Sequence, residues 1–492
     1  MARGGGLNLV SAGFSHLAEF GLSLVLARLL GASDLGVYWQ SFALLSLLGL
    51  LSLSGIGAAL TRFVAVYRAE RDPGGVRGTV RLGLSVTVSV SVILGFCLFT
   101  ISDWLASVAF DDSSLASPLR FVAATLPAVA FTNAALGATK GFKTMKPFAF
   151  IHLLLEPALR VALTISLLVL GMGLRGAMTA LAVSYVVAAV AAAVALRRLM
   201  GRPVARATYR PRQLFSFSVL SWLASLASSG LLWADTILIG IFLSSRDVGI
   251  YNVATRLVLL ASFVMLPINS SFAPRIADLY QRGWTETLSR AYAAATSWIV
   301  RLSLPGFIVI ALFTSDLLRF FGPVFGVGVG VTVVLAAGKL IDAGTGPCAM
   351  MLNMSGRPVL NMADNIVVLV VNVVLNVVLI PIYGIVGSAI AWAISLALVN
   401  IARVLQVRMI MSMWPFGLGV VKGLLAGGAS LAAGALVRVS APDQVSFPAG
   451  LVTVTIVYCG LIVLFGLTDE DRLIFTMIKT RRGATDVGGS GG

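Results

Sequence analysis

The sequence predicts an all-α polytopic membrane protein with about 14 transmembrane helices, arranged as two parallel six-helix bundles and a C-terminal helix pair. The first observation is composition: 58% of the 492 residues are hydrophobic and 11% are charged, whereas soluble domains are about a quarter charged. The second is that apolar runs of roughly 20 residues, long enough to cross about 30 Å of hydrocarbon, recur along the whole chain. The third is an internal repeat.

The apolar runs between charged or Gly/Pro/Asn breaks give the expected spans in order. Six cover 8–30, 37–66, 80–101, 118–139, 148–170 and 176–196, and six more cover 214–243, 249–278, 290–313, 324–352, 359–381 and 384–403, followed by a pair at 416–437 and 447–467. Four of these runs (37–66, 214–243, 249–278 and 324–352) are longer than a crossing requires. We expect these four to tilt or to extend beyond the bilayer.

The repeat rests on landmarks that keep their register in both halves. A D-x-G-x-Y motif begins at Asp34 and again at Asp247, an offset of 213, and a second set of matches at offset 211 includes Gly173 with Gly384. An even number of helices separates the copies, so they have the same orientation in the membrane. The predicted domains are 1–205, 206–412, an extra helix pair at 413–470 and a cytoplasmic tail at 471–492. The motif glycines are expected to permit a positive φ in a turn.

Charge and cysteine patterns narrow the function classes. The net charge of +16 lies in short clusters between apolar spans, which orient membrane helices and contact headgroups; nucleic acid is therefore not an expected partner. The largest clusters follow the second and sixth spans, and they predict that both termini are cytoplasmic. The three cysteines show no C-x-x-C spacing, so no metal site or disulfide framework is expected.

Acidic side chains within apolar spans are candidates for coupling transport to a proton or cation, because an ionisable group in the membrane is costly. Glu19 and Asp235 occupy nearly the same face of the first and seventh spans under the 213 offset. Asp342 is the third candidate ion-coupling residue. Hydrogen bonding between helices by neutral acids is the alternative interpretation.

Basic side chains within the spans are candidates for binding an anionic substrate such as a diphosphate, because a guanidinium fork suits phosphate oxygens. Arg160 and Lys339 lie deepest, and each has an acid at i−4 or i+3, Glu156 and Asp342, so a local ion pair is the alternative. Arg256 lies toward a span end, where its side chain can also reach headgroups. Arg256 is the third basic residue that the charge pattern supplies as a candidate for substrate binding.

No catalytic constellation is present in the sequence. A nucleophile elbow, a phosphate-binding P-loop and an H-E-x-x-H zinc motif are all missing. We therefore expect a transporter without a cofactor rather than an enzyme.

The residues Ala27 to Tyr38 follow the pattern A-R-x-L-G-x-x-x-[FY]-G-x-Y, with Leu35 at the aromatic position. This stretch resembles the opening of the polysaccharide-transporter branch of the multidrug/oligosaccharidyl-lipid/polysaccharide exporters, as do the segments that begin at Arg62 and Pro274. The resemblance covers essentially the whole chain. By match to the family's pattern, Arg28 and Arg62 become candidate cavity or gate residues that bind substrate.

The resemblance implies a flippase that moves a polyprenyl-diphosphate-linked oligosaccharide from the cytoplasmic to the outer leaflet, for O-antigen, capsule or exopolysaccharide synthesis. It implies the cytoplasmic membrane as the location, with a glycan polymerase and glycosyltransferases as partners beside the bilayer. It also implies that the extra helix pair lines a groove for the lipid tail. Two alternatives stay open: a cation-coupled, MATE-like multidrug exporter, and a membrane-embedded glycan polymerase or ligase.

Overall fold

The computed structural model describes residues 2–202, 205–466, 468 and 471, and every regular element among them is helical. Apart from Asp471, the predicted tail at 471–492 lies outside these residues. The chain forms two compact units: unit 1 comprises 1–256, 320–327 and 373–388, and unit 2 comprises 257–319, 328–372 and 389–492.

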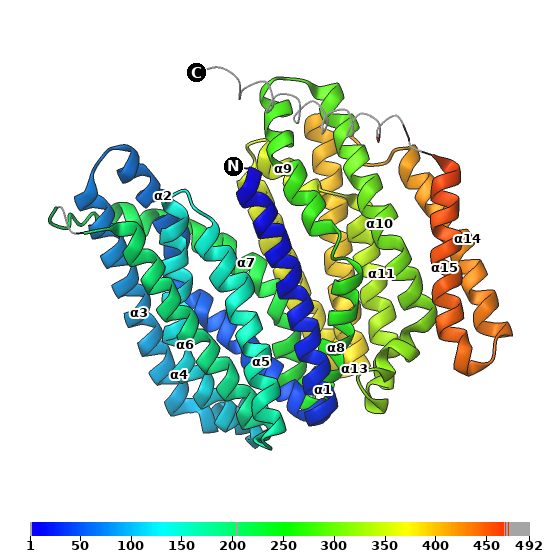
Figure 1. The fold of residues 1–492 in the computed structure, drawn as a ribbon, viewed down its shortest axis with the longest axis horizontal. Helices are drawn as coiled ribbons and strands as arrows, with labels where there is room; N and C mark the ends of the chain where they lie inside the picture. Colours follow the sequence, from blue (N-terminus) through cyan, green and yellow to red (C-terminus); the bar gives the residue numbers. More distant parts are fainter. Residues whose placement is uncertain (1, 203–204, 467, 469–470, 472–492) are drawn as a thin grey trace. The chain divides into compact units, whose positions relative to one another are not determined.

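Eight α-helices of the described residues begin in unit 1 (Figure 1). They are α1 (Ala2–Leu53), α2 (Ile56–Ala69), α3 (Pro73–Trp104), α4 (Ala116–Gly141), α5 (Glu156–Val169), α6 (Gly173–Met200), α7 (Pro211–Phe242) and α8 (Ser245–Ala261). Short π-helical segments at Leu105–Ala109 and Phe148–Leu155 extend α3 and precede α5.

The remaining helices belong to unit 2, except for the middle of α13. They are α9 (Met265–Gln281), α10 (Thr285–Arg319), α11 (Val329–Thr345), α12 (Cys348–Met354), α13 (Pro358–Met411), α14 (Leu418–Ser440) and α15 (Asp443–Phe465).

The chain is a multi-pass membrane protein. Within the described residues, ten helices are long and apolar enough to span a membrane, or twelve if each of two bent pairs counts as one span. α1 and α13 have 52 and 54 residues, and a straight helix of that length would measure about 80 Å. Breaks at Gly31 (φ 83°) and Gly384 (φ 58°) divide each into two spans, and counting both halves accounts for the predicted number.

The four runs that we expected to tilt or extend are instead bent or broken. The first is interrupted at Ser54 and Gly55 between α1 and α2, and another at Gly346 and Pro347 between α11 and α12. The other two bend, by 49° within α7 and by 51° between α8 and α9. A glycine with positive φ, which has no Cβ to clash, lies at each of the two interruptions. Gly55 precedes the start of α2, and Gly346 follows the end of α11.

The expected role of the motif glycines is wrong. Gly36 and Gly249 lie inside helices and have no positive φ. A Cβ on Gly36 would overlap the carbonyl oxygen of Ser245, and a Cβ on Gly249 would overlap that of Ala32. These glycines therefore let the backbones of α1 and α8 touch where they cross. The two contacts are reciprocal, because Ser245 and Gly249 lie 213 residues after Ala32 and Gly36.

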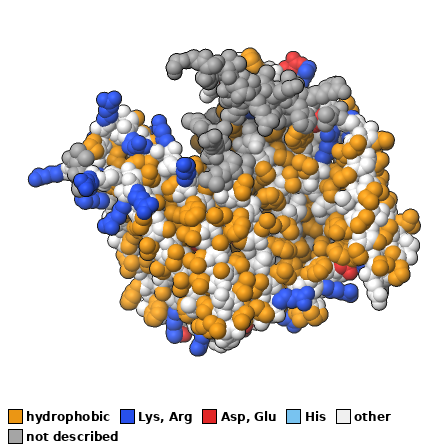
Figure 2. Space-filling model, in the orientation of Figure 1, with side chains coloured by type: hydrophobic (Ala, Val, Ile, Leu, Met, Phe, Trp, Pro, Cys, Tyr) orange, Lys and Arg blue, Asp and Glu red, His pale blue; other side chains and the backbone are white. Residues whose placement is uncertain are grey.

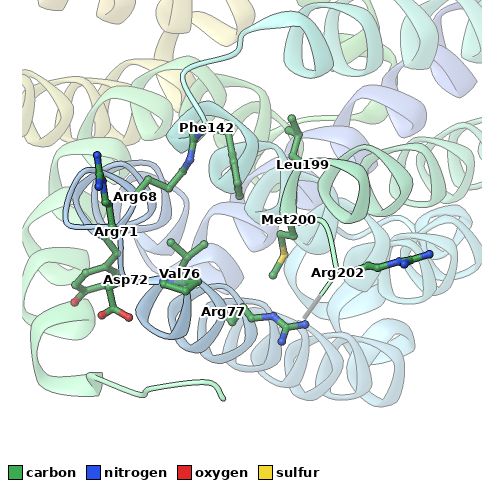
Figure 3. Close-up of a pocket in the computed structure, with 11 residues that line it drawn as sticks. Arg68, Arg71, Asp72, Val76, Arg77, Phe142, Leu199, Met200 and Arg202 are labelled. Carbon is green, nitrogen blue, oxygen red and sulfur yellow. The ribbon is translucent and has the colours of Figure 1, made fainter. Parts of the chain in front are cut away.

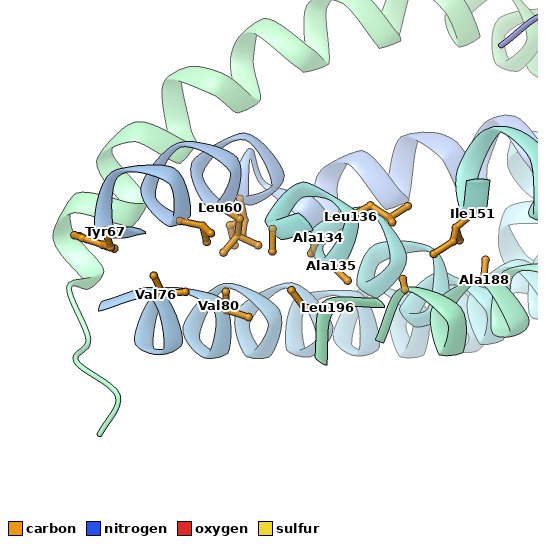
Figure 4. Close-up of a cluster of buried hydrophobic side chains, with 14 residues drawn as sticks. Leu60, Tyr67, Val76, Val80, Ala134, Ala135, Leu136, Ile151, Ala188 and Leu196 are labelled. Atoms are coloured by element: carbon orange, nitrogen blue, oxygen red, sulfur yellow. The ribbon is translucent and has the colours of Figure 1, made fainter. Parts of the chain in front are cut away.

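The core of unit 1 forms where α2, α3, α4 and α6 pack together (Figure 4). Leu60 of α2, Val80 of α3, Leu136 of α4 and Leu196 of α6 are each at most 4% exposed. The outer sides of the same helices are apolar as well: Val92, Ile93 and Phe96 of α3 are exposed. Figure 2 shows hydrophobic side chains over the sides of the helices, with Lys and Arg gathered at helix ends. This distribution fits helices that face lipid along their sides and headgroups at their ends.

In unit 2, α14 packs closely on α10 through small residues. Gly419, Gly423 and Gly427 recur every four residues on α14, and a Cβ at any of them would press on Ser297, Arg301 or Leu304 of α10. This small-residue spacing is typical of helices that associate in lipid. The carboxylate of Asp471 pairs with Arg301 (2.8 Å) and accepts from the Trp298 indole N–H (2.6 Å).

Candidate functional site

An ion pair joins two membrane-spanning helices of unit 1. Arg256 of α8 donates from a terminal guanidinium nitrogen to Oε2 of Glu19 on α1, at 2.7 Å. The Arg256 guanidinium also lies over the ring of Trp39, 4.1 Å from its centroid, in a cation–π contact. The side chains of Arg256 and Glu19 are 10% and 23% exposed, so this pair is partly accessible.

A second ion pair in unit 1 is more deeply enclosed. The Nε of Arg160 lies 3.3 Å from Oε1 of Glu156, one helical turn earlier on α5, and these side chains are 2% and 4% exposed. The Ser184 hydroxyl of α6 donates to the same carboxylate oxygen at 3.4 Å. The Arg160 guanidinium lies 5.0 Å from the centroid of Phe42. Arg160 thus forms the local pair that its spacing predicts.

Aromatic side chains on the second segment of α1 lie next to both arginines. Trp39, which contacts Arg256, is in edge contact with Phe42, which contacts Arg160; their centroids are 5.4 Å apart. Glu19, Glu156, Arg160 and Arg256, with these two rings, form what we call the charge cluster. With all four groups ionised it has no net charge. An anion that displaced Glu19 from Arg256 would therefore replace one negative partner by another, which avoids leaving a guanidinium unpaired in the membrane.

Asp235 of α7 is buried in unit 1 with donors on both carboxylate oxygens. The hydroxyl of Tyr251 donates to Oδ2 and the amide of Asn376 donates to Oδ1, each at 2.8 Å. Tyr251 is the tyrosine of the second D-x-G-x-Y motif, so the motif supplies both the close helix crossing and a donor to this acid. Glu19 and Asp235 therefore have different partners, although they stand at nearly equivalent positions of the repeat.

The third acid candidate belongs to unit 2. Lys339 pairs with Oδ2 of Asp342 at 2.6 Å, as the i,i+3 spacing predicts, and Asn400 donates to Oδ1 at 2.8 Å. A polar ladder continues from Asn400 along the second segment of α13. Arg403 donates to Asn365 (2.6 Å) and Gln406 donates to Asp364 (2.8 Å), across the two segments of that helix.

The two arginines taken from the family pattern have other surroundings. Arg28 is exposed, and its Nε donates to the carbonyl oxygen of Phe320 at 2.5 Å. Arg62 is exposed and lies over the ring of Phe217 on α7, 4.6 Å from the centroid. Of the five basic candidates, the contacts bring Arg160 and Arg256 together with Glu19, and they leave Arg28, Arg62 and Lys339 in separate surroundings.

Several residues of the site were not predicted from the sequence. Trp39 and Phe42 read as ordinary apolar residues, and nothing in the sequence marks them as partners of arginine. The polar ladder did have a signal, because Asn400, Arg403 and Gln406 recur every three residues in an apolar helix. Within the described ranges, no group of three or more His, Cys, Asp and Glu side chains is placed to hold a metal ion.

Comparison with known proteins identifies the family of this chain. A family model described as polysaccharide biosynthesis protein matches residues 1–280, and a MatE model matches residues 221–378. The chain is 33% identical over 196 residues to the probable flippase AglR of Haloferax volcanii. That match covers 39% of this chain and 41% of the relative's own length.

Solved structures of low sequence identity share the fold. The lipid II flippase MurJ in an inward closed conformation matches with a TM-score of 0.74 at 12% identity, over 93% of this chain and 98% of that one. An inward-facing multidrug resistance MATE family transporter matches with a TM-score of 0.68 at 18% identity, over 81% of this chain and 94% of that one. Because the first family model covers more than half of the sequence, the chain belongs to the polysaccharide biosynthesis protein family.

Proposed function

We propose that this protein is a flippase for a polyprenyl-diphosphate-linked oligosaccharide, which it carries from the cytoplasmic to the outer leaflet by alternating access. The observation that carries the proposal is the partly accessible Glu19–Arg256 pair on membrane-spanning helices, in a chain of the polysaccharide biosynthesis protein family. The name of the relative AglR, a probable flippase, supports the same activity.

The chemistry of the site is an exchange of anions at Arg256. A diphosphate that enters the charge cluster competes with the Glu19 carboxylate for the guanidinium, and protonation of Glu19 favours the diphosphate. Arg160 keeps its own partner and holds the adjacent ring of Phe42 in place. We assign substrate binding to Arg256, Arg160 and Lys339 and, with the family pattern, to Arg28 and Arg62. We assign ion coupling to Glu19, Asp235 and Asp342.

The lipid tail needs an apolar path, and unit 2 offers one. A pocket of about 410 Å³ lies between α10 and α15, lined by apolar side chains that include Leu302, Pro305 and Ile462. Arg301 and Asp471 line it as well. This pocket supports the expectation that the extra helix pair lines a groove for the tail.

We further propose a location in the cytoplasmic membrane with both termini in the cytoplasm, and a polymerase and glycosyltransferases as partners in glycan assembly. The domain plan remains two repeats at 1–205 and 206–412 with a helix pair at 413–470. The paired motif glycines and the positive φ shared by Gly173 and Gly384 support the repeat.

A cation-coupled multidrug exporter is the second candidate. The MatE model match over 221–378 favours it, and so does the carboxylate of Asp235, which is buried on α7 and accepts hydrogen bonds from Tyr251 and Asn376. A polymerase or ligase is less well supported, because the connection between the predicted third and fourth spans, at 102–117, is short and mostly helical.

The deciding experiment uses purified protein in vesicles that contain a fluorescent polyprenyl-diphosphate oligosaccharide, with a membrane-impermeant reagent that reports which leaflet holds the sugar. We expect exchange between leaflets to be much faster than in empty vesicles. Arg256→Gln should slow it about tenfold, since a hydrogen bond to a charged group contributes about 1.5–3 kcal/mol. Glu19→Gln should reduce the dependence of the rate on pH.

Glu286→Gln with Arg290→Gln is the matched control, because it removes an exposed Glu–Arg pair from α10 and should leave the rate unchanged. A wild-type rate equal to that of empty vesicles contradicts the flippase proposal. Drug efflux that depends on an imposed cation gradient and on Asp235 would then favour the exporter. A normal rate in Arg256→Gln removes that residue from the site.

A further inference from the structure

A basic pocket lies at one end of unit 1, where the α2–α3 connection meets the segment that follows α6 (Figure 3). Its volume is about 280 Å³, and four arginines and one acid line it, Arg68, Arg71, Arg77, Arg202 and Asp72. Figure 3 shows Arg68 and Arg71 on one side of the view and Arg202 on the other, with Phe142 and Met200 between them. The pocket shares no residue with the charge cluster.

The positive charge of the pocket is not compensated. Asp72 is already engaged, because Oδ1 accepts the Gly75 N–H at the start of α3 (2.8 Å) and Oδ2 pairs with Arg210 (3.2 Å). Within the part of the chain that the structure describes, none of the four lining arginines forms an ion pair with a carboxylate. The Nε of Arg77 is buried and has no hydrogen-bond partner there.

The convergence of the two basic segments depends on specific packing. Thr208 donates its N–H to the carbonyl oxygen of Gly74 at 3.0 Å, and a Cβ on Gly78 would overlap the Thr208 backbone. Arg77 donates to the carbonyl oxygen of Ala205 at 3.1 Å. Orienting the helices requires only that basic residues remain on one face of the membrane. It does not require two segments far apart in sequence to build one pocket.

The lining indicates the chemistry of a ligand. Guanidinium groups bind phosphate oxygens through paired hydrogen bonds, and a phosphomonoester or diphosphate carries the charge that several arginines can balance. The walls formed by Val76, Phe142 and Met200 suit an apolar or glycerol portion beside the phosphate. The pocket lies at the ends of membrane-spanning helices, where lipid headgroups are found.

We propose that this pocket binds the phosphate group of a lipid headgroup, at a site separate from the charge cluster. A phosphomonoester headgroup or a lipid diphosphate supplies the same chemistry. The proposal does not depend on which solute the protein transports.

The test is photo-crosslinking of the full-length protein in nanodiscs of phosphatidylcholine that contain a diazirine-labelled phosphatidic acid. We expect saturable labelling of peptides that span 68–77 and 199–202. Arg77→Gln with Arg202→Gln should weaken binding about a hundredfold or more, because it removes two charge-assisted contacts of about 1.5–3 kcal/mol each. Arg77→Lys with Arg202→Lys should retain most of the binding.

Arg81→Gln with Arg198→Gln is the matched control, since each of these exposed residues lies four positions from its counterpart and outside the pocket. Equal loss in both pairs, or no saturable labelling of the wild type, overturns the site. If the Arg77→Gln, Arg202→Gln double variant fails to fold, a second double variant, Arg68→Gln with Arg71→Gln, replaces it. Its control is Lys143→Gln with Lys146→Gln. We expect weaker lipid binding in the former and not in the latter.

Soluble pyrophosphate distinguishes the source of the phosphate. We expect it to displace the labelled lipid only at concentrations far above those of the lipid, because it lacks the apolar portion. Displacement at equal concentrations, with the same dependence on Arg77 and Arg202, would show a site for free phosphate and overturn the lipid assignment. Binding is the readout in every arm, so a failed transport assay leaves the result intact.

Discussion

At the residue scale, the two ion pairs of the charge cluster differ in the exposure of their side chains. Removing an ion from water costs several kcal/mol, and a partner offsets this only with good geometry. The Glu156–Arg160 pair is almost fully enclosed, so separating it would strand two charges in the protein interior. The Glu19–Arg256 pair is more exposed, at 23% and 10% of its side-chain surface, and it can exchange partners at lower cost. We therefore expect Arg256, rather than Arg160, to exchange partners during transport.

Asp112 offers a pH-dependent test of another contact in unit 1. Partial burial raises the pKa of its carboxyl, but hydrogen bonds from Ser114 and Ser245 outweigh burial and lower the pKa below its usual value. A carboxyl with a lowered folded-state pKa stabilises the fold above its unfolded pKa of about 3.9, and this contribution is lost as pH falls through the folded value.

We therefore expect Asp112→Asn to lower the thermal unfolding midpoint at pH 7 and at pH 5. The difference from the wild type should narrow as the pH falls below about 4, because the carboxyl of the unfolded chain is protonated there, whereas the folded one, with its lowered pKa, is protonated only at a lower pH. Asp111→Asn, at an exposed neighbour, is the control. Fluorescence-detected melting in detergent measures both, and a difference that widened toward low pH would contradict the assignment.

Whether the sequence predicted a polar contact depended on how far apart its two residues lie in the chain. The Glu156–Arg160 and Lys339–Asp342 pairs follow from helical spacing, because residues three or four apart share a face. Glu19 and Arg256 are 237 positions apart, and no periodicity connects them. The same holds for Asp235 and Asn376, which the fold brings together from α7 and α13. Local spacing thus predicted pairs within a helix, and tertiary packing supplied those between helices.

At the scale of elements, hydropathy located the helices but not their breaks. A run such as 37–66 is apolar throughout, so composition alone predicts one long helix. The break depends on Gly55, whose φ of 74° starts α2, whereas Gly36, one residue before the run, stays helical. Hydropathy does not distinguish the two glycines. Each meets the backbone of another helix, Gly36 at Ser245 of α8 and Gly55 at Ser218 of α7, and composition does not reveal these packing contacts.

The crossing of α1 and α8 can be tested directly. We expect Gly36→Ala to destabilise the protein by about 1–3 kcal/mol or more, because the added methyl group meets backbone that cannot rotate away. Gly249→Ala should behave in the same way. Gly21→Ala on α1 has open space around it and should be neutral or slightly stabilising, since alanine favours helix.

Thermal melting and the yield of monodisperse protein in size-exclusion chromatography measure these effects. Equal stability of Gly36→Ala and Gly21→Ala would mean that the two helices do not touch at this point.

At the scale of the whole molecule, the orientation in the membrane follows from the basic connections. Lys143 and Arg206 lie in connections predicted to be cytoplasmic, and Asp111 lies in one predicted to be external. Single cysteines at these positions, in a variant without the three native cysteines, should react with a membrane-impermeant maleimide from opposite sides. Labelling of Lys143→Cys and Asp111→Cys from the same side of intact cells would reject the topology.

The reciprocal contact of Gly36 and Gly249 also bears on the history of the chain. If a single six-helix unit once paired with a second copy of itself, equivalent residues beside the symmetry axis faced each other across an isologous interface. One substitution there altered both sides of the contact at once. After duplication and fusion, the two sides became separate codons that can diverge, and each can then be fitted to a different partner. Ser245 now stands opposite Gly36, where the first copy has Ala32 opposite Gly249, and only Ser245 has a hydroxyl, which it donates to Gln40 and Asp112.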